Sequence, residues 1–211
     1  MIVKGYVYTY LYLLLVFGIS YIINKKSNAL ISRKFIHIAP SFCFIIFYKY
    51  LRNSFHLLVV PLTIIIFNYV SYKKKLLKPM EEESSLGTVY YAVSIFIFGL
   101  ITYLNNNFYC YFGIGWFIMA FADGAAPIIG KYIKSPKIYK DKTLNGSLTV
   151  FGVAVVVCVI FNVIFNIGYS VFDIIIIGIS SFILELIGVK GFDNITLPLG
   201  VAFISYLLGG F

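Results

Sequence analysis

The chain has 211 residues, of which 61% are hydrophobic and only 12% are charged. A soluble domain carries roughly 25% charged residues, so this composition excludes an ordinary soluble protein and indicates a membrane protein. The formal net charge of +9 is better explained by basic cytosolic loops, and by attraction to membrane lipids or a nucleotide, than by nucleic-acid binding.

Eight apolar segments follow one another along the chain, and each is near the roughly 17–25 residues that a membrane-spanning helix needs. Long continuous apolar runs favour helices over a β-barrel, because every backbone group inside lipid must find its partner internally. We therefore predict an all-α bundle of about eight transmembrane helices in a single domain, residues 1–211. The expected segments are residues 6–23, 34–51, 54–71, 86–104, 108–133, 147–166, 171–188 and 194–211.

Lys and Arg are divided unequally between alternate loops: fourteen fall in one set, and only Lys4, Lys49 and Arg52 fall in the other. The positive-inside rule places the basic set in the cytosol, with residues 134–146 inside and both termini outside. All acidic residues except Asp173 fall at or near the cytosolic end. We expect an integral protein of a prokaryotic plasma membrane with its site facing the cytosol. The sequence leaves the oligomeric state open.

Asp123 lies roughly two-thirds along the fifth apolar segment. A charge near a helix centre costs about 2.5–3.5 kcal/mol on insertion scales, which makes this residue a functional candidate. Pro127 has no N–H for the carbonyl of Asp123. With Gly124 nearby, we expect the helix to break here and to line a wet cavity. The alternative is a buried carboxylate that is paired with a Lys or Arg for packing only.

A polar stretch precedes the sixth segment and carries groups that suit phosphate. Lys142 and Thr143 can contact phosphate oxygens. Gly146 and Ser147 belong to a turn that feeds a helix N-terminus, and such termini bind anions through free N–H groups. The alternative is an ordinary solvated loop with a helix cap.

Further oxygen ligands lie near the C-terminus. Glu185 ends the seventh segment, and Asp193 with Asn194 opens the eighth. These side chains can supply oxygens to a hard cation such as Mg²⁺. The alternative is that Asp193 and Asn194 only cap a helix.

Basic residues open the second segment. Arg33 and His37 stand at i and i+4, so they share a helix face, with Lys34 adjacent. Cations at a helix start oppose its dipole, so an anionic partner is expected; the alternative is a cytosolic anchor with a hydrogen-bonded His. Glu83 leads into the fourth segment, where helix capping alone is the alternative reading.

The stretch from Gly124 to Lys131 is not a Walker phosphate-binding loop. Five residues separate its glycines where that pattern needs four, and Tyr132 stands where Ser or Thr is required. Any nucleotide must therefore be bound in another way.

Taken in order, these stretches resemble the dolichol kinase, phytol kinase and CTP-dependent diacylglycerol kinase family of membrane proteins. The resemblance implies CTP as the phosphoryl donor, a divalent cation, and an isoprenoid alcohol or diacylglycerol as the acceptor. The matching pieces are Arg33-Lys34-x-x-His37, Glu83 through Gly87-Thr88-x-Tyr90-Tyr91, Asp123-Gly124-x-Ala126-x-x-x-Gly130, Lys142-Thr143-x-x-Gly146-Ser147, and Glu185 with Asp193-Asn194-x-x-x-Pro198.

We therefore expect a CTP-dependent lipid-alcohol kinase, which moves a γ-phosphoryl group onto a lipid hydroxyl at the cytosolic face. The residues expected to hold Mg²⁺ or accept the proton are Asp123, Glu185 and Asp193, and those expected to face the triphosphate are Lys131, Lys142, Arg33 and Lys34. Two alternatives remain open. One is a membrane cytidylyltransferase of a phospholipid precursor, which releases pyrophosphate; the other is a small ion-coupled transporter with Asp123 as its ion site.

Overall fold

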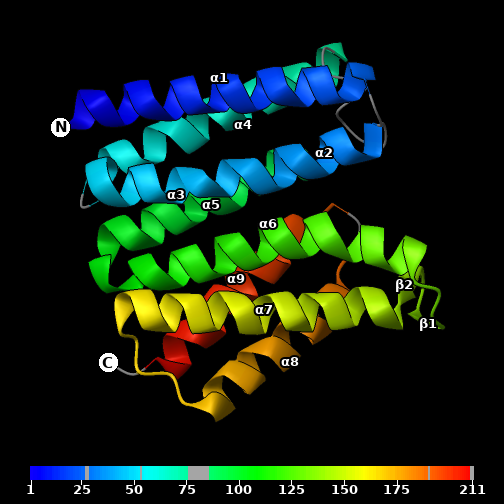
Figure 1. Ribbon diagram of the computed structural model, residues 1–211. Helices are drawn as coiled ribbons and strands as arrows, with labels where there is room; N and C mark the ends of the chain where they lie inside the picture. Colours follow the sequence, from blue (N-terminus) through cyan, green and yellow to red (C-terminus); the bar gives the residue numbers. More distant parts are fainter. Residues whose placement is uncertain (27–28, 53, 76–85, 190, 210–211) are drawn as a thin grey trace.

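The structure is a computed structural model that describes residues 1–26, 29–52, 54–75, 86–189 and 191–209. These residues form a helical bundle with a short β-hairpin at one end (Figure 1). The elements are α1 (Ile2–Lys26), α2 (Ala29–Ile38), α3 (Cys43–Ile46), α4 (Val59–Lys74), α5 (Gly87–Leu104), α6 (Tyr109–Tyr132), β1 (Lys137–Tyr139), β2 (Lys142–Thr143), α7 (Leu144–Phe165), α8 (Val171–Ile187) and α9 (Asp193–Leu208).

Six helical segments of the described chain are long and apolar enough to cross a membrane. They coincide with the first six expected segments, so the prediction of a helical membrane bundle is confirmed. Helices α8 and α9 occupy the last two expected segments but have only 17 and 16 residues. The count of eight spans therefore stays a prediction. The six segments are Ile2–Lys26, Ala29–Leu51, Phe55–Lys74, Gly87–Leu104, Asn106–Tyr132 and Leu144–Phe165.

Helix α6 runs through the middle of the bundle and contacts α2, α5, α7 and α9. Helix α8 packs against α7 and α9, while α1 lies against α2 and α4 against α5. The start of α1 and the end of α9 lie at the same end of the bundle, opposite to the hairpin (Figure 1). Because α6 touches four other helices, a polar side chain on it can meet residues from distant parts of the sequence.

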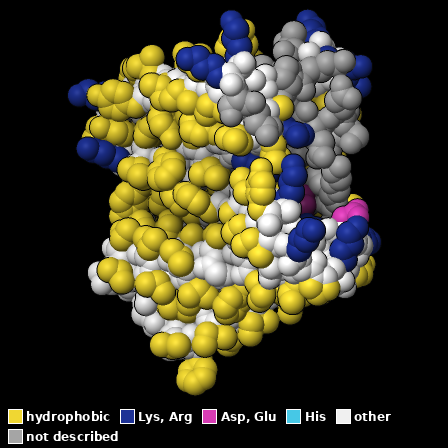
Figure 2. All heavy atoms as spheres, turned by 45° about the vertical axis from the view of Figure 1, so that its right-hand side comes forward, with side chains coloured by type: hydrophobic (Ala, Val, Ile, Leu, Met, Phe, Trp, Pro, Cys, Tyr) yellow, Lys and Arg dark blue, Asp and Glu magenta, His cyan; other side chains and the backbone are white. Residues whose placement is uncertain are grey.

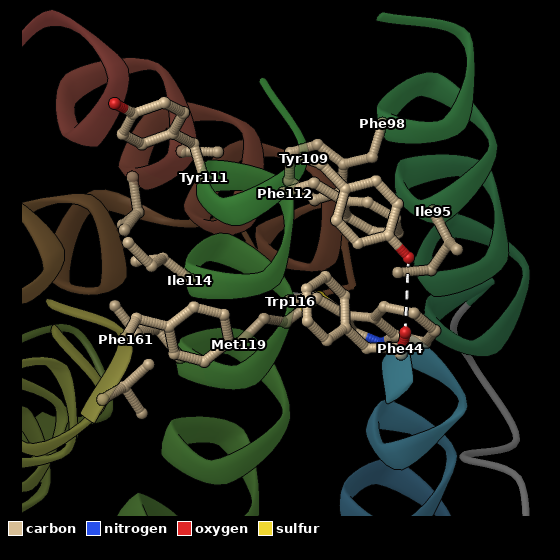
Figure 3. Packing of buried hydrophobic residues seen from close by; sticks show 14 of the residues in the cluster. Phe44, Ile95, Phe98, Tyr109, Tyr111, Phe112, Ile114, Trp116, Met119 and Phe161 are labelled. Carbon is tan, nitrogen blue, oxygen red and sulfur yellow. Dashed lines mark hydrogen bonds between the residues drawn. The ribbon is translucent and has the colours of Figure 1, made fainter. Parts of the chain in front are cut away.

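Aromatic rings from α3, α6 and α7 build much of the apolar core (Figure 3). The ring centroid of Phe44 lies 4.9 Å from that of Tyr109 and 5.6 Å from that of Phe161. The Tyr109 hydroxyl donates to the carbonyl oxygen of Phe44 at 3.2 Å. Gly113 allows this approach, because a Cβ there would lie 2.6 Å from Phe44 Cζ. Close packing of this kind holds helices together where lipid surrounds them.

The expected break of the fifth helix at Pro127 is wrong, since α6 continues through this proline to Tyr132. Proline deprives the Asp123 carbonyl of its helical donor. In the structure, Lys34 Nζ donates to that oxygen at 2.7 Å. The lost hydrogen bond is thus replaced from another helix, and the backbone need not open.

A second difference lies in the loop between α6 and α7, for which the sequence indicated no strand. Strands β1 and β2 pair antiparallel there. Lys140 takes a φ of 48° in the turn between them, a left-handed conformation that is uncommon for residues other than glycine. The hairpin brings Lys142 to the N-terminal end of α7.

Candidate functional site

A polar cavity of about 340 Å³ lies at the hairpin end of the bundle, between α6, α7, α8 and α9. Lys and Arg side chains gather around acidic side chains at this end (Figure 2). Nine of the fourteen predicted site residues line the cavity, so the structure brings together segments that are far apart in sequence. These nine are Asp123, Lys131, Lys142, Thr143, Gly146, Ser147, Glu185, Asp193 and Asn194.

Asp123 is held by two side chains from α2. Lys34 Nζ lies 3.3 Å from its Oδ1 atom, and His37 Nδ1 lies 3.2 Å from its Oδ2 atom. Lys34 and His37 are three residues apart, so they project from one face of the helix. The carboxylate is paired, as the packing-only alternative requires. It also lines the cavity and keeps 33% of its side chain exposed, which favours the functional reading.

A second group of contacts centres on Glu185, whose side chain is 12% exposed. Lys142 Nζ donates to its Oε1 atom, and Ser147 Oγ donates to its Oε2 atom at 2.9 Å. Lys142 Nζ also lies 3.9 Å from Asp193 Oδ2. Both oxygens of Glu185 are therefore engaged by protein donors, and this carboxylate ties strand β2 and helix α7 to helix α8.

The start of α7 is capped by Thr143, whose side-chain oxygen accepts from the N–H of Gly146 at 3.3 Å. This is the cap that the alternative reading of the loop supposed, and both residues also line the cavity. Gly130 lets α6 approach the cap closely, because a Cβ there would lie 2.7 Å from Thr143 Oγ1. Gly130 on α6 and Gly146 on α7 therefore allow the N-terminus of α7 to lie close to α6 at the cavity.

Asn194 is buried and joins two distant helices. Its Nδ2 atom donates to the carbonyl oxygen of Gly87 at 3.1 Å, which ties α9 to the start of α5. Its own N–H donates to Asp193 Oδ1 at 3.1 Å. Through these contacts Asn194 positions the start of α9 and the Asp193 carboxylate. The other carboxylate oxygen, Asp193 Oδ2, is directed towards Lys142.

The remaining predicted residues that the structure describes do not line the cavity. Gly124 packs against α2, where a Cβ would lie 2.5 Å from Ile38 Cδ1. The buried Nε atom of Arg33 has no hydrogen-bond partner within the described part of the chain. Glu83 lies outside the described residues.

Tyr91 supports His37 and was not among the predicted site residues. Its hydroxyl donates to the carbonyl oxygen of His37 at 3.0 Å and accepts from Trp116 Nε1 at 2.8 Å. The rings of Tyr91 and His37 also meet edge to face, with centroids 5.6 Å apart. A buried Tyr hydroxyl needs a hydrogen-bond partner, but the sequence does not indicate which residue supplies it.

Asp141, on the hairpin, also lines the cavity and was not among the predicted site residues.

The carboxylates do not form a ready-made metal cage. No group of three or more His, Cys, Asp or Glu side chains in the described ranges is placed to hold an ion. Mg²⁺ usually takes one or two carboxylates together with waters and substrate phosphates. Asp123 and Asp193 both line the cavity. The residues therefore fit a cation that binds together with a triphosphate.

The chain is similar to the phytol kinase of Synechocystis sp., with 30% identity over 147 residues. The alignment covers 65% of this chain and 61% of that protein, so the chain spans less than two thirds of the relative's length. No protein-family model and no solved structure matches the chain. The similarity supports the resemblance to phytol kinase-like proteins that the motifs indicate.

Proposed function

We propose that this protein is a lipid-alcohol kinase that transfers the γ-phosphoryl group of CTP to an isoprenoid alcohol or diacylglycerol at the cytosolic membrane face. The observation that carries the proposal is the placement of Asp123 at a cavity bordered by Lys131 and Lys142. The similarity to a phytol kinase supports the same reaction class. The choice of CTP rests on the family resemblance.

Phosphoryl transfer needs positive charge around the triphosphate and a fixed position for the attacking hydroxyl. Lys131 and Lys142 line the cavity directly, and the N-terminus of α7 adds N–H groups that suit an anion. Lys142 is bound to Glu185 in the described state. We assign Lys142 to the phosphates and Glu185 to the positioning of Lys142, because both Glu185 oxygens are already engaged.

In the proposed reaction, the lipid hydroxyl oxygen attacks the γ-phosphorus. A new P–O bond forms, the bond between the γ-phosphorus and the β–γ bridging oxygen breaks, and CDP leaves. The hydroxyl proton passes to a carboxylate, which we assign to Asp123. Lys34 and His37 fix that carboxylate in place, so it can orient the hydroxyl for attack.

The metal role is assigned to Asp193, while Asp123 is kept as the proton acceptor. Asp193 Oδ2 lies 3.9 Å from Lys142 Nζ, which is longer than a hydrogen bond. Among the oxygens of Asp123, Glu185 and Asp193, this one is therefore the least engaged by protein donors. Mg²⁺ held there with the triphosphate would neutralise phosphate charge.

The test is to incubate the purified protein with labelled CTP, Mg²⁺ and a panel of lipid alcohols, and to identify the products. Lipid phosphate with CDP is the expected result, and the Asp123→Asn variant serves as the control for contaminating kinases. Pyrophosphate with a CDP-lipid would identify a cytidylyltransferase instead. Absence of both product pairs across the panel would contradict the proposal.

A further inference from the structure

A second cavity, of about 840 Å³, lies between α3, α6 and α7 and within membrane-spanning segments. A hollow among hydrophobic side chains marks this face in Figure 2. We call this cavity the apolar groove. Two polar residues line it, Thr149 at one end and Tyr48 at the other. Between them the lining is aromatic or aliphatic, with one glycine, Gly152.

The apolar groove is long enough to hold a hydrocarbon chain. The 16 residue steps from Thr149 to Phe165 on α7 correspond to about 24 Å along the helix. The hydrocarbon core of a bilayer is roughly 30 Å thick. At one end of the groove, the Thr149 hydroxyl already donates to the Asn145 carbonyl. Because the lining between the two ends is apolar, its side chains offer no hydrogen-bond partner to water or to a polar ligand.

The apolar groove leads towards the polar cavity along the contact between α2 and α6. Phe42, at the groove, lies 6.0 Å from Phe121 between ring centroids. One helical turn earlier, Ile38 packs on Gly124, and one further turn brings Lys34 to Asp123. Gly124 carries no side chain, and Ile38 lies between Phe42 and Lys34 along this line.

We propose that the apolar groove binds the hydrocarbon chain of the acceptor lipid alcohol, whose hydroxyl points along the α2–α6 contact towards Asp123. The inference rests on the proposed function, which requires an acceptor with a long apolar tail. The groove volume falls within the roughly 300–1,000 Å³ of pockets that enclose small ligands. Its position in the membrane-spanning segments lets the tail enter sideways from the bilayer.

Gly152 provides a direct test, because a Cβ at this position would meet no heavy atom within 4 Å. In Gly152→Leu the new Cβ has room, and because Gly152 lines the apolar groove we expect the rest of the side chain to fill part of it. The matched control is Gly18→Leu on α1, where a Cβ also meets nothing within 4 Å and which does not line the groove. Both changes remove a helix glycine and give the same gain in helix propensity.

The first measurement is binding. A long-chain alcohol with a diazirine on its tail is photolysed with the full-length protein, and labelled peptides are mapped by mass spectrometry. We expect labels on α6 and α7, at groove residues such as Phe121 and Val156, and displacement by excess unlabelled alcohol. Filling the groove should reduce this labelling at least about tenfold in Gly152→Leu, with no reduction in Gly18→Leu.

The second measurement is kinetic: in Gly152→Leu the KM for the lipid alcohol should rise about tenfold while the KM for CTP is unchanged. Displaceable labelling without phosphoryl transfer would keep the apolar groove as a lipid site and overturn the kinase. Phosphoryl transfer with equal behaviour of both variants would overturn the groove assignment alone. Labelling that excess alcohol does not displace, and that a phospholipid probe reproduces, would identify bulk membrane lipid only and would also overturn it.

Discussion

Lys34 Nζ donates to the main-chain oxygen of Asp123 at 2.7 Å, and Pro127 is the reason that this oxygen is free to accept. The same ammonium lies 3.3 Å from the Asp123 carboxylate. One side chain from α2 therefore binds both the backbone and the side chain of the residue that we place at the centre of the reaction. This double contact fixes the position of Asp123 along α6.

Replacing Pro127 with Ala should restore the helical hydrogen bond to the Asp123 carbonyl. We expect the free energy of unfolding to rise by up to about 3 kcal/mol, seen as a higher Tm, while kcat falls about tenfold because Lys34 loses an acceptor. Adding Pro127→Ala to a Lys34→Met background should cause no further loss of kcat, since the two residues act through one contact. Additive losses in kcat would contradict this coupling.

Asp123→Asn should lower kcat by about 10²- to 10⁴-fold, because the amide cannot take the proton of the lipid hydroxyl. The protein should still fold, since the amide keeps the shape of the side chain; its elution on gel filtration checks this. Asp173→Asn, in the capping box at the start of α8 and at the other end of the bundle, is the control and should keep its activity. Near-normal turnover of Asp123→Asn would remove this residue from the mechanism.

Lys142→Ala should raise the KM for the nucleotide at least about tenfold, because it removes a phosphate partner and leaves Glu185 bound only to Ser147. Lys137→Ala is the matched control on the same hairpin. Its pair with Asp141 is exposed, and such pairs contribute only about 0.2–1 kcal/mol. Kinetics with CTP as the varied substrate distinguish the two variants, and equal KM values would make Lys142 a bystander.

Membrane orientation can be tested by cysteine labelling in a variant whose three native cysteines are replaced. We expect Ile138→Cys, exposed on the hairpin, to react with an impermeant maleimide only from the cytosolic side, because the basic loops stay inside. Phe172→Cys, exposed at the start of α8, should react only from outside. Labelling of position 138 from outside alone would reverse the topology.

CTP should exceed ATP by at least about a hundredfold in kcat/KM, on the order of 2.7 kcal/mol. A site that hydrogen-bonds the edge of cytosine leaves buried polar groups unpaired when a purine replaces it. The comparison is a pair of kinetic series with Mg²⁺ present and the lipid alcohol held constant. Equal use of both nucleotides would show that the enzyme reads only the phosphates.

Much of the fold follows from local properties of the sequence. Each long apolar run must close its hydrogen bonds within one helix, so six membrane-length helices could be located without knowing their neighbours. The cost of a charge in lipid is also local, and it singled out Asp123 before any partner was known. The polar loop with Lys142 and Thr143 was found in the same way, from residue types that suit phosphate.

What the sequence by itself could not determine was which residues meet. Lys34 and Asp123 are 89 residues apart, and Lys142 and Glu185 are 43 apart; their pairing depends on which helices pack against α6 and α7. The continuous helix at Pro127 has the same origin, because the donor that replaces the lost N–H comes from α2. Periodicity and composition describe one segment at a time, whereas the site is made by contacts between segments, and only the tertiary structure decides those.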